Sequence, residues 1–445
     1  MMIGRDQVAT SISTARMRKA DQEQQGGFED LYRPGKVHSA IYTSPEVFEA
    51  EIERIFHRTW LYIGHESEVP EPGSFQTRTM GRQPVILVRG KSGKVNVFMN
   101  RCRHRGSVVA ETECGKSAFF KCWWHGWIYD SDGQLVEVSR DDAYPEGFRE
   151  EIGGLSSPPR VDSYRGFVFA SLSPEGRSLK EHLGAATKMI DYLVDASPIQ
   201  QIQVGPNVSR TKYKGNWKFI GMDGYHPEIV HASVFQVFKQ KVNTGLGSTH
   251  RGNVLSDKSS SRTRGLGNGH CMLDYRRQRR DNLDAYLEFL GTVDGGDDYV
   301  RLMRESYDEE RANELIAVAG DADVGIFPHM QIVANHVRII NPLAMDETQI
   351  VMWPVKLLGV PEGINRMRMR AHESFYGAAS GGSPDDAEVF ERAQRGLQAN
   401  VDPWIDISRG MQREVVDVDG TIVGQASDEV PQREQMREWA RLMAG

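Results

Sequence analysis

Three absences narrow the class of this protein. The 445-residue sequence has no apolar run long enough to cross a membrane, and residues 1–27 lack the apolar region of a secretory signal. It has only four cysteines, which favours free or metal-binding thiols in a reducing compartment. Its net charge of −7 argues against nucleic acid as a partner. We therefore expect a cytoplasmic protein that binds neither membranes nor nucleic acid.

A dinucleotide-binding fingerprint is also missing. The nearest glycine-rich string, residues 265–270, does not fit the GxGxxG pattern and does not lie between a strand and a helix. If the protein is a redox enzyme, NAD(P)H must therefore be oxidised on another chain. The length suffices for two or three domains, and 39% hydrophobic with 26% charged residues is ordinary for a globular protein.

Two cysteines and two histidines are grouped at metal-binding spacing. Cys102 and His104 stand one residue apart, and after a gap of 17 residues Cys122 and His125 stand two apart. Such a set can hold one zinc ion or a [2Fe–2S] cluster. Zinc fingers usually pair like ligands, whereas each half-site here offers one thiolate and one imidazole. That order favours a cluster with two thiolates on one iron and two imidazoles on the other.

Strand and turn signals surround these ligands. Residues 85–88 and 94–99 predict a hairpin that leads to the first pair, and residues 118–121 predict a strand that leads to the second. Gly106 and Gly126 each follow a ligand histidine closely, so the backbone can approach a bound cluster there. The prediction is therefore a pair of ligand loops held on strands.

A second group of chemically active residues follows about a hundred residues later. Asp223, His226 and His231 lie in the string DGYHPEIVH, with an early NWK at residues 216–218. Two histidines five apart point about 140° from each other on a regular helix, so the helix must bulge or end near Pro227 to aim both at one ion. The alternative is a capped helix with two histidines on its polar face.

These motifs together resemble one known family. CxH…CxxH with HRG and HGW after the two pairs, followed by NWK…DGYHPEIVH, resembles the Rieske non-haem iron oxygenases that hydroxylate aromatic rings. The end-piece ERAQRGLQ…PWIDISRGMQRE is similar to their large (alpha) subunits, and the resemblance extends from about Phe48 to Met443. It is greatest to those that act on aromatic acids, such as salicylate or anthranilate, and to polycyclic-arene relatives.

The resemblance implies two metal sites. The cysteine and histidine pairs would bind the [2Fe–2S] cluster, while His226, His231 and Asp386 would bind one mononuclear Fe(II) as two histidines and one carboxylate. By its local sequence alone Asp386 is a helix-capping acid, because Ser383 would be the N-cap and a proline follows it. Asp385 and Glu388 are the other candidates for the carboxylate ligand.

Asp223 is the residue that the resemblance places between the two sites. In the family, electrons cross from the cluster of one subunit to the iron of a neighbour, so Asp223 would bridge the neighbour's His125 to its own His226. This sequence departs from many members because only four residues, 219–222, separate NWK from Asp223. About one helical turn is therefore missing, and with it the asparagine that often lies near iron.

The fold that the resemblance implies is α+β. An all-β Rieske [2Fe–2S] domain at residues 60–175 would be inserted in a helix-grip-like, antiparallel-sheet catalytic domain at residues 176–445, with residues 1–59 as an N-terminal arm and helix packed on the latter. We expect an extended arm or a partly disordered segment over residues 1–40. Helices are predicted at residues 45–57, 180–196, 298–318, 383–399 and 431–443.

The implied function is that of the terminal oxygenase in a multicomponent system. It would use O₂ to hydroxylate or dihydroxylate an aromatic ring, with electrons from NAD(P)H through a ferredoxin or reductase, as a homotrimer or an α3β3 assembly. A Rieske monooxygenase of the demethylase type and a Rieske electron carrier are the alternatives. Arg264 and Arg338 are candidates to hold a substrate carboxylate; as pocket residues we name Phe235, Phe238, Gly269, His270, Phe327 and Asn335.

Overall fold

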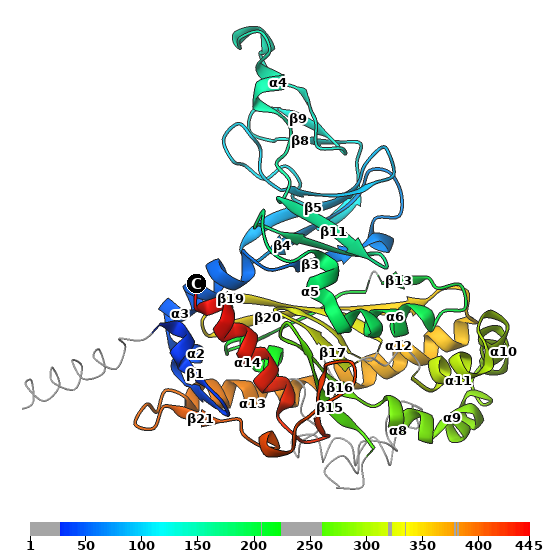
Figure 1. Cartoon of the computed structure of the whole chain (residues 1–445). Helices are drawn as coiled ribbons and strands as arrows, with labels where there is room; N and C mark the ends of the chain where they lie inside the picture. Colours follow the sequence, from blue (N-terminus) through cyan, green and yellow to red (C-terminus); the bar gives the residue numbers. More distant parts are fainter. Residues whose placement is uncertain are drawn as a thin grey trace, which may run out of the picture.

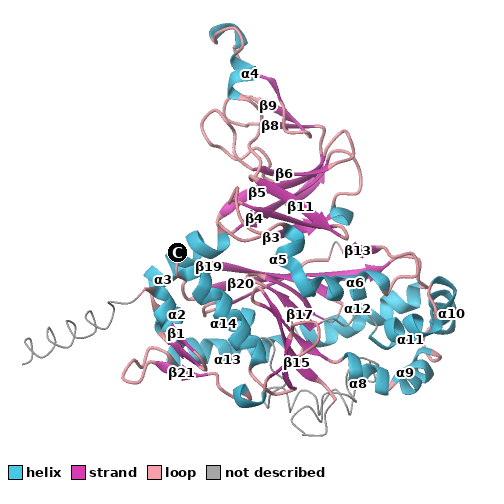
Figure 2. Cartoon of the chain, in the orientation of Figure 1, coloured by secondary structure: helices cyan, strands magenta, loops and turns pink. Residues whose placement is uncertain are grey.

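A small β lobe stands on a larger body of one wide sheet covered by helices (Figure 1). The computed structural model describes residues 27–205, 207–223, 260–318, 323–333, 335–377, 380 and 382–445. The lobe is formed by chain that lies between the N-terminal helices and α5, and both of those pack on the body (Figure 2). The predicted α+β class, with a β unit inserted in an antiparallel-sheet unit, is confirmed.

Three antiparallel sheets make up the lobe, in the orders β6-β5-β4-β7, β10-β9-β8 and β11-β12-β3. The predicted hairpin is present as β5 and β6, and the predicted strand before Cys122 as β8. The elements of the lobe are β3 (Leu61–His65), η3 (Glu66–Glu68), β4 (Ser74–Met80), β5 (Gln83–Arg89), β6 (Val95–Met99), β7 (Cys114–Lys116), β8 (Phe119–Lys121), β9 (Ile128–Asp130), β10 (Leu135–Glu137), η4 (Asp141–Ala143), α4 (Phe148–Ile152), β11 (Arg160–Tyr164) and β12 (Phe167–Ser171).

The upper part of the lobe has a core of its own. Phe75, Ile86, Phe98 and Phe120 pack there with both cysteines of the ligand loops. β5 lies between β4 and β6, so its run of valine, isoleucine and leucine is buried on both faces, as a central strand requires. The ligand loops therefore extend from a packed hydrophobic core.

The sheet of the body has ten strands among the described residues, and its order is β13-β20-β19-β18-β17-β16-β15-β23-β22 with β14 also pairing with β20. The sequence also predicts strands at residues 336–342 and 349–357 around a turn at Asp346 and Glu347. The structure has this hairpin as β19 and β20, with its turn one residue earlier, at Met345 and Asp346. The strands are β13 (Ile202–Val204), β14 (Ser209–Tyr213), β15 (Arg262–Gly267), β16 (His270–Asp274), β17 (Asp323–Ile326), β18 (Met330–Val333), β19 (His336–Ala344), β20 (Glu347–Leu357), β22 (Val415–Val416) and β23 (Ile422–Gln425).

Helices pack along this sheet. α14 lies on β15 and β16, α13 on β14, and α12 on β20. None of the helices in the described ranges is both long and apolar enough to span a membrane. The helical elements of the body are α5 (Leu179–Leu183), η5 (Gly184–Ala186), α6 (Thr187–Asp195), η6 (Phe219–Asp223), α8 (Arg276–Asp281), α9 (Leu283–Leu290), α10 (Gly296–Ser306), α11 (Glu309–Val318), α12 (Glu362–Tyr376), α13 (Ser383–Gly396), η9 (Met411–Arg413) and α14 (Val430–Met443).

The N-terminal region is more ordered than the sequence suggested. Residues 1–26 lie outside the described part, but the expectation of an extended arm up to residue 40 is wrong for the rest. There β1 (Tyr32–Arg33) and β2 (Lys36–His38) form a hairpin that pairs with β21 (Trp404–Asp406), between η1 (Phe28–Leu31) and α2 (Ala40–Thr43). Polar composition concealed this hairpin because its pairing partner comes from the distant C-terminal region.

Ser44 begins the next helix as predicted. Its hydroxyl accepts a hydrogen bond from the Val47 N–H and Pro45 occupies the first helical position. α3 (Pro45–Glu51) then widens into the π-helical turn η2 (Ile52–Phe56).

Two other predicted helices are interrupted. The one at residues 180–196 breaks at Gly184, whose φ is +48°, and the one at 298–318 breaks at Tyr307, where the backbone is extended. Asp308 then accepts a hydrogen bond from the N–H of Arg311 and starts α11. Apolar periodicity continues through both interruptions, which is why the sequence alone did not show them.

Candidate functional site

The two ligand loops of the lobe have the same backbone geometry. The N–H of Cys102 donates to the Ser107 carbonyl at 2.7 Å, and the N–H of Cys122 donates to the Trp127 carbonyl at 2.8 Å, five residues on in each case. The glycine four residues after each cysteine donates back to the cysteine carbonyl. Both glycines, Gly106 and Gly126, have positive φ, which a residue with Cβ rarely adopts. The loops therefore form a matched pair that can close on one ligand from two sides.

Burial divides the four predicted cluster ligands into two kinds. Cys102 and Cys122 are each 2% exposed, whereas His104 and His125 are half-buried. Burial raises the pKa of the Cys102 thiol, so a thiolate at this position needs positive charge beside it. A metal centre would supply that charge on the inner side and present the imidazoles outward.

The two imidazoles lie next to each other. Their ring centroids are 4.4 Å apart, and His104 also stacks on Trp127 at 4.9 Å. The Nδ1 atom of His104 is buried and has no hydrogen-bond partner, which is the condition expected of a nitrogen that binds a metal. Two adjacent thiols below two adjacent imidazoles fit a [2Fe–2S] cluster with unlike ligands on its two irons.

Tyr129 completes this site, and the sequence did not single it out. Its hydroxyl lies 3.3 Å from the Cys102 Sγ and accepts a hydrogen bond from the Arg103 N–H at 2.9 Å. Burial and the contact with Cys102 raise the pKa of Tyr129, so its hydroxyl keeps its proton and donates to the sulfur. Such a donor next to a cluster sulfur tunes the cluster's reduction potential.

Exposed aromatic side chains lie on the second ligand loop and on the strand before it. Trp123 is 83% exposed, Trp124 is 58% exposed, and Phe119 is also exposed. Trp124 stacks on His125 with 4.9 Å between ring centroids, and Arg105 lies over Trp124. Large aromatic groups exposed at one end of a lobe are typical of a surface that another protein covers.

The second predicted site is only partly within the described residues. His226 and His231 lie outside them, and of Asp223 only the backbone is described, as the last residue of the π-helical η6. Asp386 lies in the first turn of α13 and lines a cavity of about 160 Å³ between that helix and the sheet. The N-cap of α13 is Gly382. Ser383, the predicted N-cap, is instead the first helical residue.

The cavity beside Asp386 is mostly apolar. Ile220 of η6, Ile350 and Met352 of β20, and Phe390 of α13 form much of its wall. Asp386 therefore lies at the edge of a small space that is bounded by the helix leading to the predicted histidine ligands. A carboxylate at this place is suited to bind a metal ion that faces an apolar ligand.

Similarity to known proteins agrees with a cluster site in the lobe. Residues 59–152 match the Rieske [2Fe–2S] domain. Over 392 residues the chain is 33% identical to the anthranilate 1,2-dioxygenase large subunit of Acinetobacter baylyi, covering 83% of this chain and 79% of that one. The chain belongs to the Rieske ring-hydroxylating oxygenases, as a large subunit. The toluate 1,2-dioxygenase subunit alpha of Pseudomonas putida is 32% identical over 384 residues, which are 83% of this chain and 80% of that one.

The fold of this oxygenase agrees with that assignment. A structure of naphthalene 1,2-dioxygenase with indole bound superposes with a TM-score of 0.79 at 23% identity, over 93% of this chain and 94% of that one. At this identity the likeness establishes the fold. The predicted family and oxidoreductase class are confirmed, and so is the Rieske domain that carries the cluster.

A buried carboxylate anchors the helix that leads to Asp223 in this oxygenase. Glu51 of α3 accepts hydrogen bonds from the indole N–H of Trp217 at 2.8 Å and that of Trp439 at 2.6 Å, and it pairs with the Lys218 ammonium at 2.7 Å. The side chains of Glu51 and Lys218 are completely buried. Burial lowers the pKa of Lys218, and Glu51 opposes that effect. NWK thus has a structural role that its spacing did not reveal.

A signal for Glu51 was nevertheless present in the sequence. It falls on the apolar stripe of its helix, next to Phe48, Ile52 and Ile55, where a charge is unexpected. A charged residue on such a stripe must have a buried partner, since an isolated buried charge is strongly disfavoured. Its partners are distant in sequence, so the sequence could indicate that a partner exists without identifying it.

Several predicted pocket residues have other roles in this oxygenase. Phe235 and Phe238 lie outside the described residues. His270 accepts from the N–H of Phe327 and contacts the His182 carbonyl at 2.6 Å, so it ties strands together. Gly269 and Asn335 do not line the cavity beside Asp386 either. Arg264 forms ion pairs with Asp274 and Asp417 and does not line the cavity. Arg338, the other arginine predicted to hold a substrate carboxylate, does line it.

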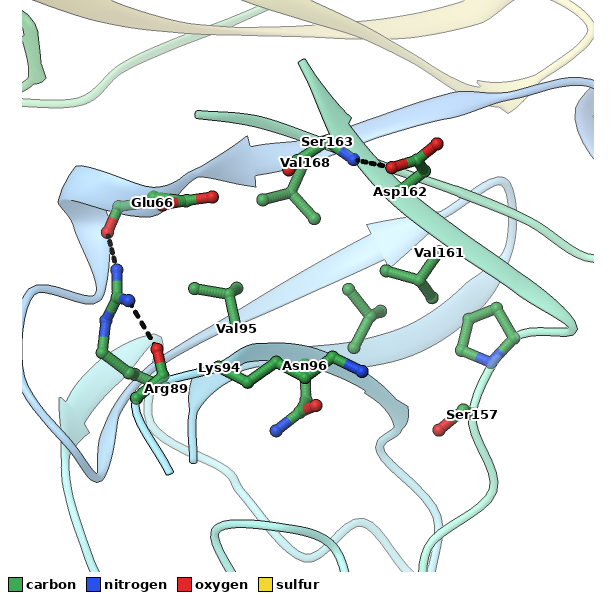
Figure 3. Close-up of a pocket in the computed structure, with 13 residues that line it drawn as sticks. Glu66, Arg89, Lys94, Val95, Asn96, Ser157, Val161, Asp162, Ser163 and Val168 are labelled. Carbon is green, nitrogen blue, oxygen red and sulfur yellow. Dashed lines mark hydrogen bonds between the residues drawn. The ribbon is translucent and has the colours of Figure 1, made fainter. Parts of the chain in front are cut away.

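A larger hollow in the lobe is separate from both metal sites. It encloses about 470 Å³ between β6 and β11, which are edge strands of two different sheets (Figure 3). Arg89 extends across one end and donates to the carbonyls of Glu66 and Gly93. None of the cluster ligands or Asp386 lines this hollow, so we assign it no part in the chemistry.

Proposed function

We propose that this large subunit uses O₂ to hydroxylate the aromatic ring of a small substrate, with electrons that reach it from NAD(P)H through a separate reductase or ferredoxin. The observation that carries the proposal is the apolar cavity whose edge is formed by Asp386, in a chain that also holds the Rieske ligand loops. When bound, the cluster supplies single electrons and a mononuclear iron supplies the site for O₂. An electron carrier would need the lobe alone.

The residues that we assign to the iron are His226, His231 and Asp386. Asp386 is the member of this set whose surroundings are described, and its place in the first turn of α13 lets a carboxylate face the cavity. The neighbouring acid Glu388 is exposed and forms an ion pair with Arg392 at 2.7 Å, which supports Asp386 over Glu388. The apolar wall would hold the ring and keep water away from it.

We infer that the working unit is a trimer of this chain, alone or with a small β subunit. The second ligand loop joins β8 to β9 in the upper part of the lobe, whereas α13 lies in the body, well apart from them in one chain (Figure 1). The exposed surface of Phe119, Trp123 and Trp124 suits a neighbour that brings its own iron site close to His125. A cytoplasmic location follows from the need for a reductase and a pool of NAD(P)H.

Replacement of Asp386 tests this function. Asp386→Ala should lose the mononuclear iron and all hydroxylated product while the visible spectrum of the cluster stays unchanged. Iron and sulfide analysis, together with incorporation of ¹⁸O from labelled O₂ into product, measures both effects. Glu388→Ala is the matched control on the same helix and should keep iron and activity. Full activity of Asp386→Ala would move the iron ligand to Asp385 or Glu388, and wild-type protein that incorporates no ¹⁸O would contradict the function itself.

A further inference from the structure

Arg338 is a buried charge beside the cavity of the proposed iron site. It lies on β19, its side chain lines the cavity, and the residue is 5% exposed. Within the described part of the chain no carboxylate forms an ion pair with it. A guanidinium removed from water is unfavourable unless an anion or several acceptors compensate it. The cavity wall therefore contains a positive charge that has no ion-pair partner among the described residues.

Gln331 holds this guanidinium in position. The two residues face each other as partners on β18 and β19, and the Nε of Arg338 donates to the Gln331 side-chain oxygen. The Gln331 amide in turn donates to the Ile220 carbonyl at 2.9 Å, on the helix that leads to Asp223. With Nε engaged, the two terminal nitrogens remain as donors, and this pair matches the two oxygens of a carboxylate.

The other charges at the cavity are already assigned. Lys212 pairs with Glu347 at 3.0 Å and is half exposed at the rim. Asp386 would give its charge to the iron, so it is not the counter-ion of Arg338. The anion that compensates Arg338 must then come with the ligand.

The size of the cavity limits the rest of the ligand. Its volume of about 160 Å³ is close to the ~150 Å³ of an apolar cavity that holds one benzene molecule. Ile350, Met352 and Phe390 give it apolar walls. We propose that the substrate is a single-ring aromatic carboxylate, and that Arg338 binds its carboxylate and thereby directs the ring toward Asp386. This inference rests on the proposed function and specifies its substrate class.

Binding of a charged and a neutral ring of the same shape tests the inference. Benzoate and benzamide are titrated into the purified trimer by calorimetry, without electron supply, so that binding is measured apart from turnover. The wild type should bind benzoate more tightly than benzamide. Arg338→Gln should weaken benzoate binding by roughly 10- to 100-fold, the range for loss of a charge-assisted pair, and leave benzamide binding within about threefold.

Two further variants separate charge from structure. Arg338→Lys keeps the charge without the two-pronged donor and should lose less affinity for benzoate than Arg338→Gln does. Arg264→Gln removes an arginine that is engaged in ion pairs outside the cavity and should bind benzoate as the wild type does. The cluster spectrum and iron content of each variant establish that it is folded and loaded.

The possible results distinguish failure of the carboxylate specificity from failure of the oxygenase function. Wild-type protein that binds benzamide as tightly as benzoate, or that binds neither, overturns the inference. So does an Arg338→Gln variant that is folded and binds benzoate with unchanged affinity. Turnover of toluene with reductase and NADH is assayed in parallel; product from toluene together with either of these results leaves the oxygenase function intact and removes only the carboxylate specificity.

Discussion

At the scale of single residues, the reduction potential of the cluster depends on which groups donate hydrogen bonds to its sulfur atoms. Tyr129 lies on β9, just after the second ligand loop, and reaches Cys102 of the first loop; its oxygen accepts a hydrogen bond from the Arg103 N–H. Because burial raises the pKa of this phenol, it remains a donor throughout the working pH range. A donor to a sulfur stabilises the reduced, more negative cluster and raises its potential.

Removing that hydroxyl should lower the potential without removing the cluster. Tyr129→Phe is expected to shift the reduction potential down by roughly 50 mV, which corresponds to about 1 kcal/mol for one electron. Protein-film voltammetry measures it. Tyr144→Phe is the control, since Tyr144 packs near Trp127 without contacting a ligand thiol. An unchanged potential in Tyr129→Phe would show that the hydroxyl only positions the loop.

At the scale of elements, Glu51 anchors the start of the helix η6. That carboxylate of α3 contacts Trp217 and Lys218, the two residues just before η6, and Trp439 of α14, and all of these side chains are buried. Three segments from different parts of the chain thus meet at one charge. Its partners immediately precede the segment that carries the predicted histidine ligands.

Breaking this ion pair from one side should be costly. Glu51→Gln leaves Lys218 buried without a counter-ion, and we expect a loss of about 3–5 kcal/mol in the free energy of unfolding together with lower iron content. The double variant Glu51→Gln with Lys218→Met removes both charges, keeps an acceptor for the indoles, and should recover most of the loss. Urea denaturation and metal analysis measure both quantities.

A surface pair provides the comparison for that experiment. Lys212 and Glu347 are also joined by a short contact, at 3.0 Å, but both side chains are about half exposed. Glu347→Gln should cost no more than about 1 kcal/mol because water screens the pair. Equal costs for Glu51→Gln and Glu347→Gln would contradict the anchoring role of Glu51.

Buried histidines on several elements should make this oxygenase sensitive to acid. Burial lowers the pKa of His65, His270 and His372 to about 4 and that of His329 to about 3. Below pH 6.5 the unfolded chain binds protons that these folded residues cannot accept, so stability falls as the pH falls from 6.5 toward 4. Each histidine contributes up to about 1.4 kcal/mol per pH unit.

The measurement is the urea midpoint at pH 7.5, 6.5 and 5.5. We expect little change between the first two values and a marked drop at the third. Asp274 would act in the same direction at still lower pH, since Arg276 and Arg264 hold the pKa of its carboxyl at about 2 despite burial, and its contribution is lost below 3.8. A midpoint that stays constant down to pH 5.5 would show that these histidines are charged in the folded protein.

At the scale of the whole molecule, β8 and β9, which flank the second ligand loop, lie well apart from α13 (Figure 1). We therefore expect the iron proposed at Asp386 to receive its electrons from the cluster of a neighbouring chain. Asp223, at the end of η6, is the residue that we expect to link its own iron site to a neighbour's His125. Asp223→Asn should keep the fold, both metals and the trimer, accept electrons at the cluster, and form almost no product.

Single-turnover mixing of reduced Asp223→Asn protein with substrate and O₂ measures the blocked step. The reduced cluster should persist for many wild-type turnover times, because the amide lacks the negative charge that we expect to orient both imidazoles and tune their basicity. Light scattering confirms the oligomer. Reoxidation of the cluster at the wild-type rate with normal product would assign the inter-subunit route to other residues.

Much of the cluster site and of the fold could be predicted from sequence because the interactions involved are local. Cys102 and His104, and likewise Cys122 and His125, are close neighbours in the chain, so their spacing already restricts the geometry of each loop. The hairpins β5–β6 and β19–β20 join adjacent strands, and their turns are marked by short polar stretches. Ser44 caps α3 through residues within three positions of it.

The tertiary structure alone decided which distant residues meet. The pairing of β2 with β21, the contact of Tyr129 with Cys102, the buried charge of Glu51 between α3, η6 and α14, and the alignment of Gln331 with Arg338 all join separate segments. Spacing within one segment carries no information about such contacts. Short-range steric and hydrogen-bonding preferences therefore determined the ligand loops and local elements from the sequence, whereas packing of the whole chain decided which charges are buried, which are paired, and that Arg338 rather than Arg264 faces the cavity.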